Sequence, residues 1–245
     1  MTGSATTDPT ITDPSGAVHD VAVPAYFHPV VWPDLWERMQ GLAAELRFVV
    51  VNPHNGVGDG TDSTYAGAVA GLVRAGVRTV GYVDTAYGER DPADVVAEAG
   101  LYRERYGIDG VFLDQASNDL AGVSTYERYL LGLRTSGVRF VVLNPGVHPH
   151  PAYVEKANVT VTFEGPFDDY VQLEEPGWVR ERPASRFCHL VHGLHGPADA
   201  RRARSLVARR HARTVCLTEG SGDNPWDRLP IGLAEDDVRG HGRAC

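Results

Sequence analysis

Eight short runs of β-branched and aromatic residues recur along the chain, and each is followed by a turn and then by a segment with helical character. β-Branched and aromatic residues favour strands, whereas Gly, Pro, Asn and Asp mark the turns that end them. Strands that alternate with helices form parallel βαβ units. The eight predicted strands are Ala22–Phe27, Phe48–Pro53, Thr79–Thr85, Gly110–Gln115, Phe140–Pro145, Asn158–Glu164, Arg186–Gly193 and Thr214–Gly220.

The segments between these runs predict helices for most of the connections. Asp62 and Ser63 are candidate N-caps of one helix, which Gly76 ends, and Asp91 followed by Pro92 opens the next helix. The predicted helices are Trp32–Arg47, Ser63–Ala75, Asp91–Tyr106, Ser124–Ser136, Ala152–Ala157 and Ala198–His211, with a loop-like piece around Phe167–Trp178.

Eight consecutive units of this kind predict an α/β fold that is a single (β/α)8 TIM barrel. The alternative is an open, doubly wound sheet, but no G-x-G-x-x-G motif follows the first run, which disfavours a dinucleotide-binding version. The length of 245 residues suits one barrel, and no linker interrupts residues 22–233. We therefore expect a barrel domain at residues 21–235, a flexible N-terminal tail at 1–20 and a loose C-terminal tail at 236–245.

Charge and cysteine content disfavour several classes of partner. The net charge is −9, from 23 basic and 32 acidic residues, and an acidic chain repels nucleic-acid phosphates. No apolar run reaches the roughly 18 residues of a membrane helix, and residues 1–20 lack the pattern of a secretory signal. Cys188, Cys216 and Cys245 show no C-x-x-C spacing. These features predict a cytoplasmic protein without a nucleic-acid or membrane partner, unless a signal was removed; they leave the oligomeric state open.

Polar residues end the apolar runs at the same point in each predicted strand. In such a barrel the catalytic groups lie at the C-terminal strand ends, and alternate side chains face the interior. On the fourth strand, this rule places Val111 and Leu113 toward the helices and Asp114 inward. On the sixth strand, we expect Val159, Val161 and Phe163 toward the helices and an inward set of Thr160, Thr162 and Glu164.

The same alternation predicts a ring of polar side chains around one mouth of the barrel. Convergent polar groups in a concave mouth are typical of a ligand site, although strand ends also turn polar simply because they leave the core. The remaining members of the ring are Tyr26, Asn52, Tyr82, Asn144, His192 and Thr218, with His28 as a neighbour.

Asp114 and Glu164 form a pair of carboxylates in this ring. Paired carboxylates suit glycosidic cleavage, in which one group donates a proton and the other acts as an ionised nucleophile or base. A separation of about 5–5.5 Å leads to retention of configuration, and about 6.5–9.5 Å leads to inversion. The alternative is a purely structural role, with both carboxylates bound to loop amides.

Three histidines, His189, His192 and His195, form an H-x-x-H-x-x-H string that resembles a metal site. A spacing of three alternates the faces of a strand, so His189 and His192 should point in opposite directions, and His195 lies beyond the strand. We therefore predict no metal and no other cofactor. No G-x-S-x-G motif occurs, which disfavours acyl transfer by a serine nucleophile.

Seven short motifs occur in order over residues 22–230. Together they resemble the spherulation-specific family 4 (spherulin 4-like) proteins, which are similar to glycoside hydrolase family 135 and more distantly to family 114. The motifs are Pro24-Ala-Tyr-Phe-His-Pro29 before a tryptophan, Val51-Asn-Pro-His-Asn-Gly-Val-Gly58, Gly81-Tyr-Val-Asp-Thr-Ala-Tyr87, Asp109-Gly-Val-Phe-Leu-Asp114, Leu143-Asn-Pro-Gly146, Phe163-Glu164 and Asn224-Pro-Trp-Asp-Arg-Leu-Pro230.

The resemblance implies a (β/α)8 glycoside hydrolase that cleaves α-1,4-linked galactosamine or N-acetylgalactosamine polymers. It also implies Asp114 as the nucleophile and Glu164 as the acid/base. The family commonly has Asp-Glu at the fourth strand end, where this chain has Asp114 and Gln115. Glutamine cannot carry charge or transfer a proton, so the chemistry is impaired if that glutamate is essential. The loss of a neighbouring anion also favours the ionised form of Asp114.

Three functions follow as hypotheses, each with a carbohydrate or sugar-like small molecule as partner. The first is a retaining glycosidase, endo-α-1,4-galactosaminidase-like, that acts on a (galactos)amine-containing glycan. The second is an intracellular tailoring enzyme for a small glycosylated metabolite, and the third is a non-catalytic carbohydrate-binding barrel. In each case the ring residues would bind sugar hydroxyls, together with Gln115 and with Trp226 or Tyr87 stacked on a sugar ring.

Overall fold

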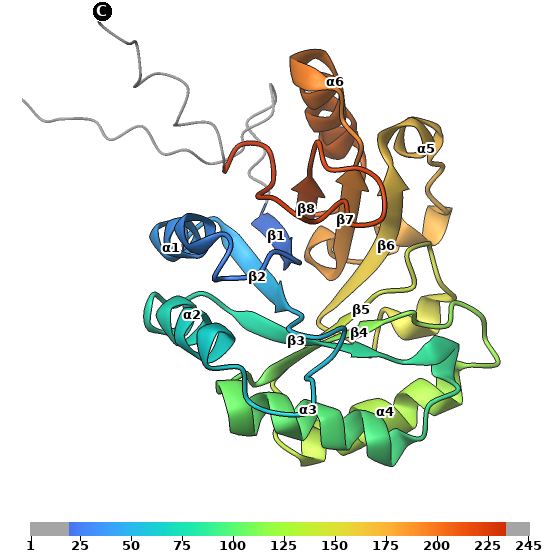
Figure 1. Cartoon of the computed structure of the whole chain (residues 1–245). Coiled ribbons are helices and arrows are strands. Elements are labelled where there is room, and N and C mark those ends of the chain that lie inside the picture. Colours follow the sequence, from blue (N-terminus) through green and yellow to red (C-terminus); the bar gives the residue numbers. More distant parts are fainter. Residues whose placement is uncertain (1–19, 234–245) are drawn as a thin grey trace, which may run out of the picture.

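The structure, a computed structural model, describes residues 20–233. Within them, eight parallel strands pair in chain order from β1 to β8, and β8 pairs with β1 to close the barrel (Figure 1). The predicted (β/α)8 barrel is confirmed, whereas residues 1–19 and 234–245, which include most of both predicted tails, lie outside the described residues. The strands are β1 (Asp20–Ala25), β2 (Leu46–Val51), β3 (Thr79–Asp84), β4 (Gly110–Asp114), β5 (Phe140–Leu143), β6 (Val159–Pro166), β7 (Phe187–His192) and β8 (Thr214–Leu217).

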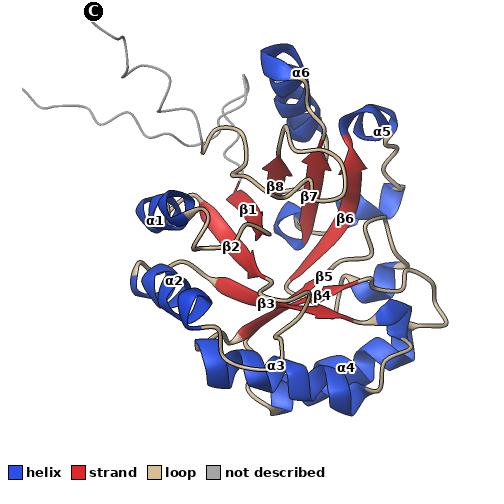
Figure 2. Ribbon diagram, in the orientation of Figure 1, coloured by secondary structure: helices blue, strands red, loops and turns tan. Residues whose placement is uncertain are grey.

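Helices surround the barrel on its outside (Figure 2). The capping predictions are confirmed, because Asp62 and Asp91 accept hydrogen bonds from the first amides of α2 and α3. The α-helices are α1 (Pro33–Gly41), α2 (Ser63–Arg74), α3 (Pro92–Tyr106), α4 (Val123–Thr135), α5 (Phe167–Gln172) and α6 (Gly196–Arg209), and the 3₁₀ segments are η1 (Ala86–Gly88), η2 (Pro151–Tyr153), η3 (Gly177–Glu181) and η4 (Ala184–Arg186).

Three predicted connections differ from the structure. The helix expected over Ala152–Ala157 is only the 3₁₀ segment η2, followed by turns and bends. The helix expected over Trp32–Arg47 ends at Gly41, and Leu46 and Arg47 already belong to β2, where Leu46 pairs with Val21. The segment expected as a loop around Phe167–Trp178 begins with the short helix α5. None of the helices in residues 20–233 is long and apolar enough to cross a membrane.

Apolar side chains fill two separate layers, one inside the barrel and one between the barrel and its helices. Val111 and Leu113 of β4 belong to the outer layer, whereas Phe112 lies in the interior, as the alternation predicts. The interior layer holds Ala22, Phe48, Val50, Val80, Tyr82, Phe112, Phe140, Val142, Val159, Val161, Cys188, Leu190, Cys216 and Trp226.

Strand β6 contradicts the predicted alternation over its first half. Val159 and Val161 face the barrel interior, not the helices, whereas Phe163 packs in the outer layer. The reason is a β-bulge: Val161 pairs with Cys188 and Phe163 with His189, so Thr162 is one extra residue without a partner in β7. Beyond the bulge the phase is reversed, and Glu164 is turned toward the mouth.

The two threonines expected to face inward do not do so. Thr162 lies on the outer side of β6, where its Oγ1 is 3.2 Å from Nε2 of the buried His189. Thr160 pairs with Leu143 and Phe187, both of which belong to apolar clusters outside the barrel interior. The prediction for Thr160 and Thr162 is therefore wrong, because residue counting along a strand fails when the strand holds a bulge.

Candidate functional site

A single amide joins the two carboxylates at the mouth of the barrel. Nδ2 of Asn144 donates to Oδ1 of Asp114 at 2.7 Å and to Oε2 of Glu164 at 2.5 Å. Because both oxygens bind the same nitrogen, the distance between them cannot exceed 5.2 Å. The ends of β4, β5 and β6 each supply one member of this group.

The loop after β5 holds the Asn144 amide in this orientation. Asn144 is buried, and its own Oδ1 accepts a hydrogen bond from the backbone amide of Gly146. Gly146 has a φ of +67°, a conformation that favours glycine, and its carbonyl accepts the backbone amide of Glu164. The Asn144-Pro145-Gly146 turn thus positions both the bridging amide and the backbone of β6.

Burial and hydrogen bonding together give the two carboxylates different pKa values. Burial raises the pKa of Glu164 to about 7, aided by the charge of Asp114, although its hydrogen bond from Asn144 acts in the opposite direction. Burial also raises the pKa of Asp114, but hydrogen bonds from Tyr82, from the Gln115 backbone amide and from Asn144 all favour its ionised form. Near neutral pH, Glu164 can hold a proton beside an ionised Asp114.

The raised pKa of Glu164 has a consequence for stability. The folded chain retains this proton between about pH 4.5 and 7, whereas the unfolded chain releases it, so stability falls as the pH rises through this range. We expect Glu164→Gln to be more stable than the wild type at pH 8, by on the order of 2–3 kcal/mol, and nearly equal to it at pH 4. Urea unfolding at both pH values measures this difference. The exposed Glu174→Gln is the control, and an equal gain at pH 4 would contradict the assignment.

Aromatic side chains line the space around the pair. Tyr26 and Tyr82 meet edge to face with ring centroids 6.0 Å apart, and the charges of Asp114 and Glu164 help to raise the pKa of both phenols. Trp226 is almost fully buried and hydrogen-bonds to Glu164. These rings exclude water from the two carboxylates, which is the cause of their raised pKa values.

His192 lies beside Trp226, with ring centroids 5.6 Å apart and the planes nearly perpendicular. Its Nδ1 is buried and has no hydrogen-bond partner, and burial lowers the pKa of the ring. A neutral imidazole with an unpaired buried nitrogen is suited to a hydroxyl or amide of a ligand. The opposite orientation of His189, which packs against Tyr170 of α5, agrees with the predicted alternation on β7.

Two predicted ring residues and their predicted neighbour His28 have local structural contacts instead. Oδ1 of Asn52 accepts the amide of Gly56, Oγ1 of Thr218 accepts the amide of Gly220, and His28 lies 3.7 Å from Asp62 and packs on Tyr65. Each of these side chains orders a loop at the rim. The structure therefore brings Tyr26, Tyr82, Asn144, His192 and Trp226 close to the carboxylates, but gives Asn52, Thr218 and His28 a supporting position.

Asp84 is a third carboxylate that the sequence analysis missed. It ends β3 and pairs in register with Asp114, and its charge contributes to the raised pKa values of Asp114 and Tyr82. Its Oδ1 accepts the amide of Ala86, and Arg90 binds its backbone carbonyl. The sequence could have indicated this position, because Tyr82 and Asp84 are two residues apart on the predicted third strand and therefore face the same side.

Three non-glycine residues beside Asp114 have a strained backbone conformation. Ala86, Tyr87 and Gln115 have φ values of +45°, +55° and +46°, a region that L-residues rarely occupy. The two segments are tied together, since the amide of Tyr87 donates to the carbonyl of Gln115 at 2.8 Å. Tyr87 is exposed as a result, and the backbone amide of Gln115 turns toward the Asp114 carboxylate. Strain of this kind is concentrated at functional sites.

Comparisons with known proteins identify the family of this chain. The model of the spherulation-specific family 4 matches residues 20–235. The chain is 31% identical over 224 residues to Spherulin-4 of Physarum polycephalum, an alignment that covers 86% of this chain and 66% of that protein, just under two thirds of its length. It is also similar to the crystal structure of Aspergillus clavatus Sph3 in complex with GalNAc, with a TM-score of 0.76, 22% identity and coverage of 89% and 95% of the two chains. The Sph3 likeness shows the shared fold, and the family match shows that this chain belongs to spherulation-specific family 4.

Proposed function

We propose that this chain is a glycoside hydrolase that cleaves an amino-sugar-containing glycan with retention of configuration. The observation that carries the proposal is the Asp114–Asn144–Glu164 arrangement, in which facing carboxylate oxygens lie within 5.2 Å. Two carboxylates that share one amide donor lie close together, which supports retention, because the carboxyl groups are about 5–5.5 Å apart in retaining enzymes and about 6.5–9.5 Å apart in inverting enzymes. The bound GalNAc in Aspergillus clavatus Sph3 supports an amino sugar as the substrate class.

The mechanism uses each carboxylate twice. In the first step, the ionised Asp114 attacks the anomeric carbon, the glycosidic C–O bond breaks and Glu164 gives its proton to the leaving oxygen. In the second step, Glu164 removes a proton from water, the water oxygen attacks the anomeric carbon and the bond to Asp114 breaks. Glu164 recovers its proton and Asp114 its charge, so the enzyme is unchanged.

Asn144 and Tyr82 assist by holding Asp114. Both donate hydrogen bonds to its carboxylate, so they fix its orientation and stabilise its ionised form before attack and after release. In this proposal His192 binds the sugar through its unpaired nitrogen and the exposed Tyr87 through its ring face.

The test of this function is the anomer first released from a short α-1,4-linked galactosamine or N-acetylgalactosamine oligomer. We expect NMR spectra recorded within the first turnovers to show the α-anomer, which then mutarotates. Initial release of the β-anomer would refute retention but not hydrolysis. Binding of the oligomer by calorimetry without any cleavage would refute hydrolysis and support a carbohydrate-binding barrel.

The pH profile gives a second prediction. Cleavage requires ionised Asp114 and protonated Glu164, so kcat/KM should rise above the pKa of Asp114, which is raised from 3.8, and fall as the pH passes about 7. A fully N-acetylated oligomer should be used from pH 4 to 9, because it has no amine that titrates. An activity that still increases between pH 7 and 9 would exclude Glu164 as the proton donor.

The position of Gln115 favours hydrolysis over a binding-only function. Its side chain is exposed, and its contact with Asp114 comes from the backbone amide, which a change of side chain retains. The glutamine therefore leaves the contacts of the carboxylate pair in place.

We expect Gln115→Glu to change kcat/KM at pH 6 by less than about threefold and to move the acidic limb to higher pH, because the added charge raises the pKa of Asp114. Gln172→Glu, at the exposed end of α5, is the charge-matched control. If Gln115→Glu created activity in an inactive wild type, the binding-only function would be correct.

A further inference from the structure

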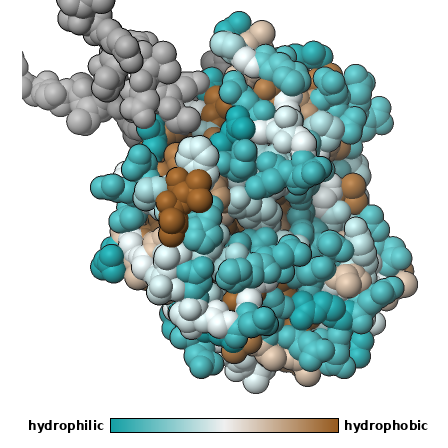
Figure 3. Space-filling view, in the orientation of Figure 1, coloured by the Kyte–Doolittle hydropathy of each residue, from teal (hydrophilic) through white to brown (hydrophobic). Residues whose placement is uncertain are grey.

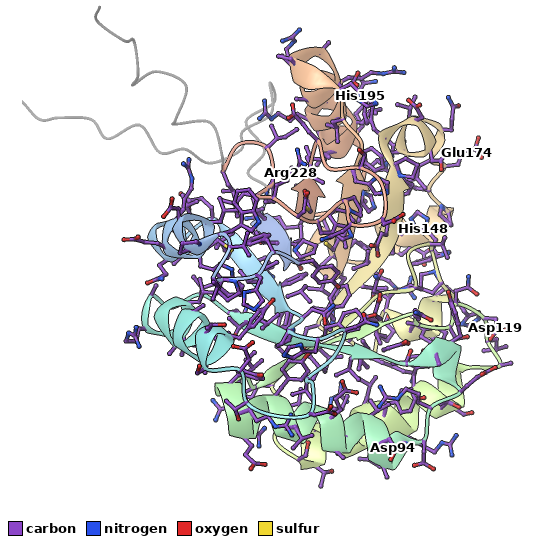
Figure 4. The ribbon with its side chains drawn as sticks, in the orientation of Figure 1. Asp94, Asp119, His148, Glu174, His195 and Arg228 are labelled. Atoms are coloured by element: carbon purple, nitrogen blue, oxygen red, sulfur yellow. The ribbon has the colours of Figure 1, made fainter. Side chains whose placement is uncertain are left out.

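A second group of chemically active side chains lies on the flank of the barrel, outside the mouth. His148 follows β5, Glu175 follows α5, and His189 projects outward from β7, and one ligand atom of each lies within 4.8 Å of the others. Figure 4 labels His148 beside β6, and Glu174, the neighbour of Glu175, beside α5. Along the chain His189 lies in one string with His192 and His195, whereas the fold brings it together with His148 and Glu175.

The donor set and its spacing suit a metal of the zinc class. Two imidazoles and one carboxylate are common ligands of Zn²⁺, with bond lengths of about 2.0–2.2 Å. Three atoms within 4.8 Å of one another have a common centre no more than about 2.8 Å from each (4.8 divided by √3). Inward shifts of less than about 1 Å therefore give zinc-like distances, which side-chain rotation at His148 and Glu175 can supply.

The state of His148 favours a ligand. Its Nε2 is buried and lacks a hydrogen-bond partner, which is a cost unless something occupies the site. Trp178 packs its ring edge to face with the imidazole at 6.1 Å and covers it.

The neighbours of His189 and Glu175 resemble the outer shell of a metal site. The ring nitrogens of His189 meet the hydroxyls of Tyr170 at 3.0 Å and Thr162 at 3.2 Å. A metal takes one nitrogen, and the other keeps its hydroxyl, which fixes the orientation of the ring.

The Glu175 carboxylate is held by the backbone amide of His211 at 2.9 Å. Its cationic neighbour Arg180 is at 3.5 Å with 63% of its side chain exposed and also donates to the carbonyl of Arg209 at 3.2 Å, so a bound ion would replace a solvent-exposed ion pair.

We propose that His148, Glu175 and His189 bind one divalent transition-metal ion, with Zn²⁺ as the best match, in a site separate from the Asp114–Glu164 pair. The ion would connect the loop after β5, the segment after α5 and strand β7. The same β5 loop carries Asn144, and its Gly146 carbonyl holds the backbone of Glu164. The proposed ion thus ties down the wall of the mouth without contacting the reacting atoms.

The experiment is calorimetric titration of chelator-treated protein with Zn²⁺ alone, with Co²⁺ absorption as a report on coordination. We expect one ion per chain, visible d–d bands typical of four-coordinate Co²⁺, and a higher unfolding temperature with Zn²⁺. His148→Ala and Glu175→Gln should each weaken binding more than tenfold. Tyr170→Phe, which removes only the hydroxyl beside His189, should weaken it by about 10–100-fold if that hydroxyl orients the ring.

Two controls separate this site from other histidines. His195→Ala removes the exposed end of the histidine string and should leave binding unchanged. Asp62→Asn disrupts a rim group in which His28 and His54 both lie within 4 Å of the Asp62 carboxylate. The proposal is overturned if Zn²⁺ does not bind, if binding survives both His148→Ala and Glu175→Gln, or if it is lost in Asp62→Asn instead.

Discussion

Asp114→Asn is expected to lower kcat/KM for an amino-sugar oligomer on the order of 10⁴-fold or more, as loss of a covalent nucleophile does in other hydrolases. The asparagine keeps the size of the side chain and its place beside Asn144, but it cannot form the bond to the anomeric carbon. The unfolding temperature should stay within a few degrees of the wild type. Circular dichroism and steady-state kinetics on the same preparation measure both quantities.

Glu164→Gln should have a different signature because Glu164 transfers protons and forms no bond to the sugar. We expect a loss of about 10²–10⁴-fold on natural oligomers, whose leaving alcohol needs the proton. With an aryl glycoside, which has an acidic leaving group, the first step should be nearly normal and an intermediate should accumulate. Added azide should then restore turnover as the glycosyl azide, because azide attacks without a base.

These two variants test the roles separately. If Asp114→Asn and Glu164→Gln both hydrolyse oligomers as fast as the wild type, the catalytic pair is wrong. If azide rescues Asp114→Asn with retention instead of Glu164→Gln, the two roles are exchanged. Glu174→Gln, at an exposed position, provides the activity control.

Gly220→Ala is expected to have the largest effect among the glycine substitutions near the mouth. Gly220 follows β8 with its backbone bonded to Thr218 and Gly193, and a Cβ at this position would collide with the backbone carbonyl of Pro225. Because that contact is with backbone, the loop must move. Trp226 directly follows Pro225 in this loop, and its indole contacts Glu164.

We therefore expect Gly220→Ala to destabilise the protein by about 3 kcal/mol or more and to reduce kcat/KM more than tenfold at temperatures where the protein remains folded. Gly67→Ala is the matched control, since its Cβ meets nothing within 4 Å on the exposed face of α2. That change should stabilise by about 0.5–1 kcal/mol because it restricts the unfolded chain. Unfolding in urea measures both, and normal stability of Gly220→Ala would contradict the crowding.

The barrel and half of the carboxylate pair could be predicted because they depend on short-range patterns. The alternation of Val111, Phe112, Leu113 and Asp114 is regular, so counting placed Asp114 correctly. Glu164 was also expected to face inward, and it does. The same count placed Val159 and Val161 toward the helices, whereas they face the interior, because the bulge at Thr162 shifts the alternation between them and Glu164. A bulge inserts one residue without a strong compositional signal, so counting cannot detect it.

Other features could not be predicted because they depend on contacts between distant segments. The sequence does not show which way the side-chain amide of Asn144 points. In the structure the backbone amide of Gly146 binds Oδ1, which leaves Nδ2 to donate to Asp114 and Glu164. The grouping of His148 with Glu175 depends on where α5 ends and on the outward face of β7.

The surface adds a feature that residue periodicity did not anticipate. Val30, Val31 and Trp32 are exposed in the loop between β1 and α1, and Figure 3 shows apolar atoms gathered close to α1. A neighbouring pocket of about 380 Å³ includes Trp32 together with Glu219 and Asp227. Arg228 lines the same pocket and pairs with Asp227 at 2.7 Å.

The bulge in β6 divides one strand into two independently adjustable parts. The packing of the barrel interior constrains the residues before Thr162, whereas the orientation of Glu164 constrains the residues after it. Exchanges of Val159 or Val161 for other apolar residues can therefore accumulate without turning the carboxylate. The bulge, more than the identity of residue 162, decides the direction of Glu164. If Thr162 paired regularly with β7, Phe163 would turn into the barrel and Glu164 into the outer layer, whereas a strand without residue 162 would keep Val161 and Glu164 on the interior side.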